Sequence, residues 1–138
     1  MKPSLSFLFF LLFAFSIVAA PSALQNELDQ GPKWEKLGTR KVKYTIDRDE
    51  ILVTRMEGRF SAIKIKVEKA PIDLMRCVIH YGNGQTQEVQ LRNTIRAGSE
   101  TRVIDIPGRK RIIKKVVFWY DTKNHADKRA RVELWGRH

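Results

Sequence analysis

The sequence predicts an all-β protein, a jelly-roll-like sandwich of two sheets built from about eight or nine short antiparallel strands. Three observations support this fold class. Apolar and charged residues alternate with period two, most clearly where Ile63, Ile65 and Val67 are separated by Lys64 and Lys66. Turn-forming residues separate the apolar segments at short intervals. No segment shows the period of about 3.6 residues that marks an amphipathic helix.

The segments expected to form strands follow one another along most of the chain. They cover residues 34–37, 40–46, 51–53, 60–67, 74–81, 89–95, 103–106, 112–120 and 130–135. We expect the first strand to end at Gly38. Asn83-Gly84 favours a tight hairpin turn because Asn and Gly tolerate positive φ. The consecutive apolar residues 116–119 predict a central strand covered on both faces.

The N-terminus predicts export. Lys2 is followed by residues 5–20, which contain no charged residue and end in small residues, as in a secretory signal peptide. The apolar run is shorter than the roughly 20 residues of a transmembrane helix, although an uncleaved anchor remains the alternative. We expect residues 1–20 to be the signal peptide, with cleavage as late as residue 23. Residues 21–33 then form a flexible lead-in, and residues 34–138 form a single sandwich domain.

The charge of the chain indicates an anionic partner once export is considered. The formal net charge is +11, and removal of Lys2 with the signal lowers it by one. In a cytosolic protein such a charge would suggest nucleic acid. A periplasmic or secreted bacterial protein meets envelope lipids, acidic polymers and glycans instead, so we do not expect genomic nucleic acid as the partner. Long-range attraction favours all of these anions without selecting one, and a merely soluble basic surface explains the charge equally well. The oligomeric state is left open.

No pattern in the sequence predicts a catalytic or cofactor chemistry. The three histidines lack metal-ligand spacing, and no nucleophile elbow, P-loop or dinucleotide-binding motif occurs. We therefore expect no cofactor and incline toward a protein that is not an enzyme. Cys77 is the single cysteine and lies in an apolar run, so it is expected to be a buried hydrophobic residue that forms no internal disulfide.

The strongest local cluster of charged residues spans residues 101–111. Asp105 stands among apolar strand residues, and Arg102, Arg109 or Arg111 could pair with it. Two interpretations stay open: an ion pair that fixes the turn at residues 107–108, or an anion-binding pocket lined by the same arginines.

Two further candidate sites depend on single residues. Asp47 and Asp49 are weak candidates for a metal site, because calcium needs six or more oxygen ligands and a turn held by side-chain hydrogen bonds accounts for them as well. Trp119 is the best candidate for an exposed aromatic platform that stacks on sugar rings, because alternation places it opposite two aromatic neighbours.

Several motifs together resemble a known family. They are Trp34-Glu35-Lys36-Leu37-Gly38, Asp47-Arg48-Asp49 with Ile51, Tyr81-Gly82-Asn83-Gly84, Ile95-Arg96-Ala97-Gly98, and the segment from Arg102 to Tyr120. Over nearly the whole mature chain they are similar to a family of small exported bacterial proteins catalogued as a domain of unknown function. The resemblance implies a periplasmic or secreted β-sandwich. It implies no activity, cofactor or catalytic residue.

We therefore expect an exported, non-catalytic β-sandwich that binds an anionic envelope component or a glycan. One alternative is a hydrolase of envelope polysaccharide that uses Asp47, Asp49 or Asp105 in a cleft between carboxylates. Another alternative is a structural or assembly module, which would show an apolar contact patch rather than a polar pocket.

Overall fold

The computed structural model describes residues 31, 33–42, 48–121 and 129–138. The chain divides into two compact units, Met1–Gly31 and Pro32–His138, and the second contains every described strand. The predicted signal peptide, its cleavage site and most of the predicted lead-in lie outside the described residues. Within the described part, no helix is long and apolar enough to span a membrane.

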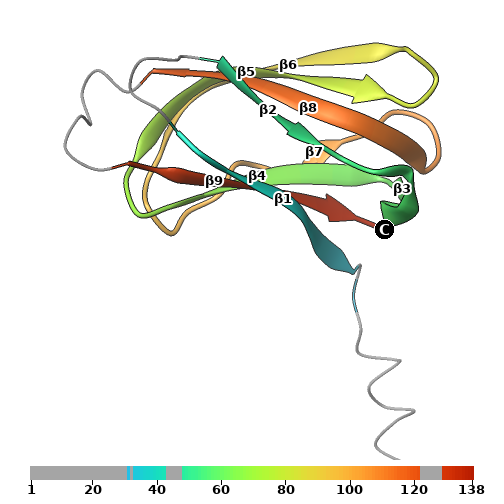
Figure 1. The fold of residues 1–138 in the computed structure, drawn as a ribbon, viewed down its shortest axis with the longest axis horizontal. Coiled ribbons are helices and arrows are strands. Elements are labelled where there is room, and N and C mark those ends of the chain that lie inside the picture. Colours follow the sequence, from blue (N-terminus) through green and yellow to red (C-terminus); the bar gives the residue numbers. More distant parts are fainter. Residues whose placement is uncertain (1–30, 32, 43–47, 122–128) are drawn as a thin grey trace, which may run out of the picture. The chain divides into compact units, whose positions relative to one another are not determined.

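The second unit is a sandwich of two antiparallel sheets (Figure 1), which confirms the predicted fold class. Its strands are β1 (Trp34–Lys41), β2 (Arg48–Leu52), β3 (Arg59–Phe60), β4 (Ala62–Glu68), β5 (Ile72–Tyr81), β6 (Thr86–Ile95), β7 (Ile104–Asp105), β8 (Arg111–Asp121) and β9 (Arg131–Arg137), and a 3₁₀ turn, η1 (Arg55–Glu57), precedes β3. One sheet has the order β1-β9-β4-β7. The other has the order β2-β8-β5-β6, with β3 also paired to β8.

The strand pairs are nested, as in a jelly roll. β1 pairs with β9, β2 with β8, β4 with β7 and β5 with β6, so the chain folds like one long hairpin rolled around a core. The innermost turn is the β5–β6 hairpin at residues 82–85, where Gly84 has a φ of 91°. The predicted hairpin turn is therefore formed, although Gly84 has a positive φ and Asn83 does not.

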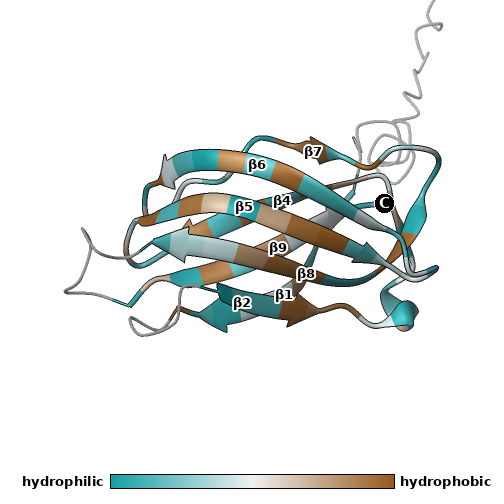
Figure 2. Ribbon diagram, turned by 90° about the horizontal axis from the view of Figure 1, so that it is seen from above, coloured by the Kyte–Doolittle hydropathy of each residue, from teal (hydrophilic) through white to brown (hydrophobic). Residues whose placement is uncertain are grey.

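The core fills the space between the two sheets. Hydrophobic and hydrophilic residues alternate along many of the strands in Figure 2, and the apolar positions face inward because burial removes them from water. Phe60, Phe118 and Leu134 are fully buried. Since burying one such side chain contributes about 1.5–3 kcal/mol, packing alone can hold this domain.

Two predicted strand boundaries are wrong. β1 continues through Gly38, with a bulge between Lys36 and Gly38. A Cβ atom at Gly38 would lie 2.5 Å from Ile51 Cγ2, so the glycine permits a close approach to β2 and does not end the strand. The predicted strand 60–67 is divided, because Phe60 pairs with β8 in one sheet whereas Ala62 begins β4 in the other.

Candidate functional site: a basic end of the sandwich

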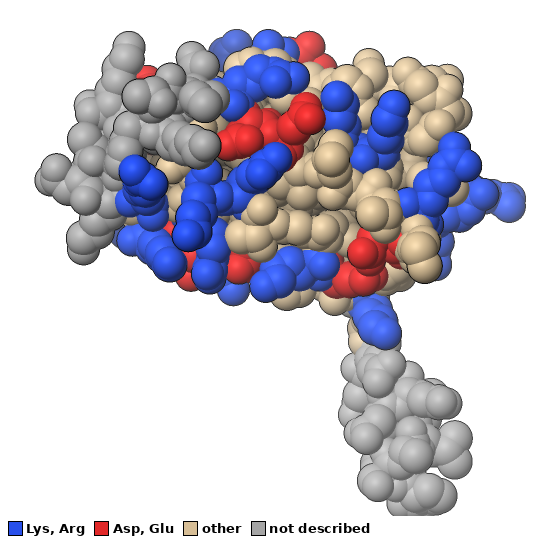
Figure 3. Space-filling model, viewed as in Figure 1, with Lys and Arg blue, Asp and Glu red and all other residues tan. Residues whose placement is uncertain are grey.

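Three connections meet at one end of the sandwich: the η1 turn with β3, the β5–β6 hairpin, and the loop from β7 to β8 (Figure 1). Two pockets lie here, and both are lined by Arg59. We call this surface the basic end and define it by the six cationic residues that line the two pockets. These are Arg55, Arg59, Arg109, Lys110, Arg111 and Arg137. Figure 3 shows Lys and Arg side chains at this end of the molecule.

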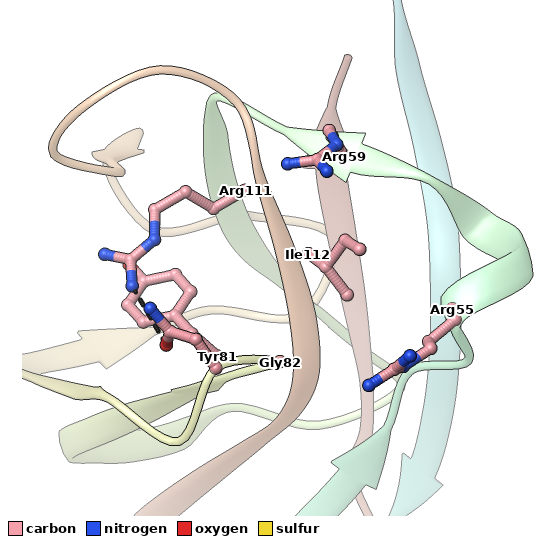
Figure 4. Close-up of a pocket in the computed structure, with 7 residues that line it drawn as sticks. Arg55, Arg59, Tyr81, Gly82, Arg111 and Ile112 are labelled. Atoms are coloured by element: carbon pink, nitrogen blue, oxygen red, sulfur yellow. Dashed lines mark hydrogen bonds between the residues drawn. The ribbon is translucent and has the colours of Figure 1, made fainter.

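The first pocket has a volume of about 280 Å³ and contains three arginines (Figure 4). Arg111 is fixed in place: its guanidinium carbon lies 3.7 Å from the centre of the Tyr81 ring. Its Nη2 donates hydrogen bonds to Gln85 Oε1 at 2.6 Å and to Asn83 Oδ1 at 3.3 Å. The β5–β6 hairpin thus holds Arg111 at the pocket wall, and Gln85 and Asn83 are uncharged, so its positive charge is not neutralised there.

Arg55 and Arg59 reach the same pocket from η1 and β3. Gly58 lies between them with a φ of 95°, a conformation that glycine adopts without strain. Both arginines are exposed, and neither forms a salt bridge with any acidic residue in the described part of the chain. Their charges are therefore available to an external anion.

The second pocket is an open groove of about 730 Å³ lined by residues of β3, β7, the β7–β8 loop and β9. Asp105 lies here and forms an ion pair with Arg137, with an Nη2–Oδ1 distance of 3.4 Å. The prediction that Asp105 pairs with Arg102, Arg109 or Arg111 is thus wrong. β4 places Ala62 in register with both Asp105 and Arg137, so the partner comes from β9, far away in sequence.

The other arginines of the predicted cluster separate. Arg109 lines the groove and Arg111 the first pocket. Arg102 lines neither pocket, and its Nη2 donates to the Gln90 carbonyl oxygen at 3.0 Å. Of the predicted cluster, Asp105, Arg109 and Arg111 thus line the two pockets, whereas the lining residues Arg55, Arg59 and Arg137 were not predicted.

Trp119 lies on the outer face of the β2-β8-β5-β6 sheet, away from the residues that line the two pockets. It is half-buried, in register with Arg48 on β2 and Arg76 on β5. The Arg76 guanidinium lies 3.7 Å from the ring centre and that of Arg48 lies 5.6 Å away. Since a guanidinium already stacks on the indole, a sugar would have to displace Arg76 from that side to use this ring.

The predicted aspartate sites are only partly described. Asp47 lies outside the described residues, and Asp49 is paired with Arg40 at 3.4 Å between Oδ1 and Nε. In the described part of the chain no three His, Cys, Asp or Glu residues gather as metal ligands. Asp49 and Asp105 are thus each paired with an arginine, which leaves the hydrolase alternative without a described pair of facing carboxylates from this set.

A second group of titratable residues adjoins the basic end and was not predicted. His138 Nε2 contacts Glu35 Oε2, and its ring lies 4.7 Å from that of Phe60. Hydrogen bonds with His138 and Glu57 lower the pKa of Glu35, whereas the hydrogen bond with Glu35 raises the pKa of Glu57. Because Glu57 belongs to η1, this group links the turn that carries Arg55 to β1 and to the end of β9.

Cys77 is fully buried on the inner face of β5. Burial raises the pKa of its thiol to about 12, so the reactive thiolate is scarce at neutral pH. The predicted role as a buried hydrophobic residue agrees with this environment.

The family described as "Domain of unknown function (DUF2541)" matches residues 6–136. The chain belongs to this family. No curated protein matches the DUF2541 chain in sequence. Its fold is similar to that in a solved structure titled "Structural and functional characterization of Pseudomonas aeruginosa AlgX", with a TM-score of 0.51 and 12% sequence identity. The similarity covers 72% of this chain and 26% of that one, so the DUF2541 chain spans about a quarter of the AlgX structure, and at this identity the likeness concerns the fold alone.

Proposed function

We propose that this chain is an exported, non-catalytic binding module that holds an anionic component of the bacterial cell envelope, such as an acidic glycan, at its basic end. The observation that carries the proposal is the lining of the two pockets that share Arg59. Six lining residues are cationic, and Asp105, itself paired with Arg137, is the one acidic residue among them. Unneutralised guanidinium groups around a recess favour an anionic ligand.

The proposed location rests on the N-terminal sequence. Residues 1–20 have the pattern of a secretory signal, with Lys2 before an uncharged apolar run. A periplasmic or secreted protein of this charge meets acidic glycans, lipid phosphates and other envelope anions. The charge would draw them to the basic end by long-range attraction.

The chemistry of the first pocket favours binding over catalysis. Its described lining residues include no Asp, Glu, His, Cys, Ser or Lys, and the hydroxyl of its one tyrosine, Tyr81, donates to Gln87 Oε1. Burial raises the pKa of Tyr81, so the phenolate that could act as a base or nucleophile is scarce near neutral pH. Arginine stays protonated near neutral pH and therefore does not exchange protons with a substrate. What these side chains supply is fixed positive charge and hydrogen-bond donors.

Binding of a ligand at the basic end would need several weak ion pairs at once. An exposed ion pair contributes at most about 1 kcal/mol, so a single anionic group would bind weakly. A polymer with repeated charges could occupy the first pocket and the groove together, and linked contacts raise the overall affinity. The basic end therefore suits a polyanion better than a small isolated ion.

The test is the retention of the protein on immobilised acidic glycans and lipopolysaccharide as salt is raised. We expect wild type to bind at low salt and to elute earlier as salt increases, because electrostatic attraction is screened. The triple variant Arg55→Gln, Arg59→Gln and Arg111→Gln should elute markedly earlier.

The control variant Lys41→Gln, Lys69→Gln and Arg96→Gln loses the same number of charges from exposed positions that line neither pocket. We expect it to elute close to wild type. Equal elution of the two triple variants would show that overall charge, and not the basic end, determines retention. No salt-sensitive retention of wild type on any of these matrices would overturn the proposed function.

A further inference from the structure

We infer that the first pocket of the basic end recognises the phosphate monoester group of its ligand. This inference rests on the proposed function and adds the chemical class of the bound group. It depends on three guanidinium groups on three different elements: Arg55 on η1, Arg59 on β3 and Arg111 on β8.

The number and placement of the arginines favour phosphate over carboxylate. A carboxylate carries one charge and presents two oxygens in one plane. A phosphate monoester carries about −1.5 to −2 charges near neutral pH and presents three acceptor oxygens in three directions. In Figure 4, Arg59 and Arg55 lie on either side of Ile112, and Arg111 lies beside Tyr81 on the other side of the β8 ribbon. Guanidinium groups that approach from different elements could pair with different phosphate oxygens, whereas a carboxylate presents its two oxygens in one plane.

The pocket is partly organised before a ligand arrives. Arg111 stacks on Tyr81 and is held by Gln85 at 2.6 Å, so little freedom remains for it to lose on binding. Tyr81 is itself fixed, because its hydroxyl lies 2.5 Å from Gln87 Oε1. A preorganised guanidinium beside two exposed ones suits the recognition of a compact anionic group.

Close packing keeps the floor of this pocket rigid. A Cβ atom at Gly82 would lie 3.0 Å from Ile112 Cγ2, and the Gly82 amide donates to the Ile112 carbonyl oxygen at 2.9 Å. The hairpin and β8 therefore hold each other at this point. The floor offers no further charge, so the three arginines determine which group binds.

The neighbouring groove gives room for the rest of the ligand. It has a volume of about 730 Å³, shares Arg59 with the first pocket and contains Ile106 and Gly108 beside its charged residues. A phosphate at the end of a larger molecule could occupy the first pocket while the remainder lies in the groove. Sugar phosphates and phosphorylated lipid headgroups both present this group.

The test is an NMR titration of arginine Nε–Hε signals in the full mature protein with glucose 6-phosphate, inorganic phosphate, glucuronate and glucose. At about pH 7.5 we expect glucose 6-phosphate to bind roughly tenfold more tightly than glucuronate, and glucose not to bind. At about pH 5.5 this preference should shrink, because the phosphate has gained a proton whereas glucuronate keeps its charge.

Two variants separate pocket recognition from general charge. Arg59→Lys keeps the charge and loses the planar pair of donors, so it should weaken glucose 6-phosphate binding by about fivefold. Arg96→Gln, an exposed change elsewhere, should leave both this binding and the retention on acidic glycans unchanged. If Arg59→Lys fails to fold, Arg55→Lys serves the same purpose, since the η1 residues are not buried.

The outcomes distinguish this inference from the proposed function. Equal affinity for glucuronate and glucose 6-phosphate, or the same ratio at both pH values, would overturn phosphate recognition while retention on acidic glycans still supported the module. Loss of all salt-sensitive retention would overturn the proposed function itself. Vesicles that contain phosphatidic acid distinguish the sources: binding to them without binding of glucose 6-phosphate assigns the phosphate to a lipid, and the reverse assigns it to a glycan.

Discussion

Replacing Gly136 by alanine tests how tightly the core is packed around Phe60, the residue that follows Arg59 in β3. Gly136 is buried on β9, and a Cβ atom there would be 2.6 Å from Phe60 Cδ1 and 2.9 Å from Leu37 Cδ1. Favourable carbon contacts lie at about 3.5–4.0 Å. Phe60 is fully buried and Leu37 nearly so, so neither side chain can move away into solvent without exposing apolar area.

The expected magnitude follows from two opposing effects. Overpacking a well-packed core costs about 1–3 kcal/mol. The alanine also lowers the entropy of the unfolded chain, which stabilises the folded state by about 0.4–1 kcal/mol. We therefore expect Gly136→Ala to lower the free energy of unfolding by about 1–2 kcal/mol, which corresponds to a Tm lower by roughly 4–15 °C for a domain of this size.

The assay is urea unfolding of Gly136→Ala, Phe60→Leu and the double variant. Phe60→Leu alone should be destabilising because it leaves a cavity. The smaller side chain also makes room for the new methyl group, so the double variant should be more stable than the sum of the single changes by at least about 0.5 kcal/mol. A neutral Gly136→Ala, or strictly additive changes, would refute the close contact between Gly136 and Phe60.

Three other predictions concern single groups. Cys77 should react with a thiol reagent in the native protein at the rate of unfolding, since it is buried and its pKa is about 12; fast native labelling would contradict this. Thr101→Val should lower the free energy of unfolding by about 1–3 kcal/mol, because Thr101 Oγ1 accepts from the buried Ile65 amide at 3.0 Å, whereas Thr101→Ser keeps the bond and should cost less. The hydrogen bond with Glu35 raises the pKa of Glu57. Protonated Glu57 therefore stabilises the folded state at low pH, and this stabilisation is lost as the pH rises through the raised pKa. Glu57→Gln cannot titrate, so its Tm relative to wild type should rise between about pH 4 and pH 7, and a constant difference would contradict the coupling.

The sequence predicted the sheets because burial acts on alternate residues of a strand. Ile63, Ile65 and Val67 are buried on β4 whereas Lys64 and Lys66 are partly exposed, as the period-two pattern required. The division at Ser61 was missed, although the apolar positions change phase there, because Ile63 follows the apolar Ala62 directly. Which strand a residue pairs with is decided by tertiary packing.

The candidate site was predicted only in part, because tertiary packing brings most of its residues together. Arg109 and Arg111 are close together in sequence and follow the turn at residues 107–108, so the sequence alone identified their cluster. Arg59 adds to them only because β3 pairs with β8, which places Arg59 in register with Ile112. Exposed arginines carry no periodic signal, so Arg55 and Arg59 could not be distinguished from other surface charges. The Gly58 between them was the one local sign of a constrained turn.

The crossing at Ser61 connects the fold to the site. The Ser61 amide donates to the Arg137 carbonyl oxygen at 2.8 Å, and the Ser61 carbonyl oxygen accepts from the Ile106 amide at 2.9 Å. Arg137 Nε also donates to the Ser61 hydroxyl at 3.0 Å. Ser61 thus joins β9 to the segment after β7. It lies directly after β3, the strand that contains Arg59. These hydrogen bonds at the crossing therefore hold Arg137 beside the groove that Arg59 also lines, and the basic end is a consequence of how the jelly roll closes.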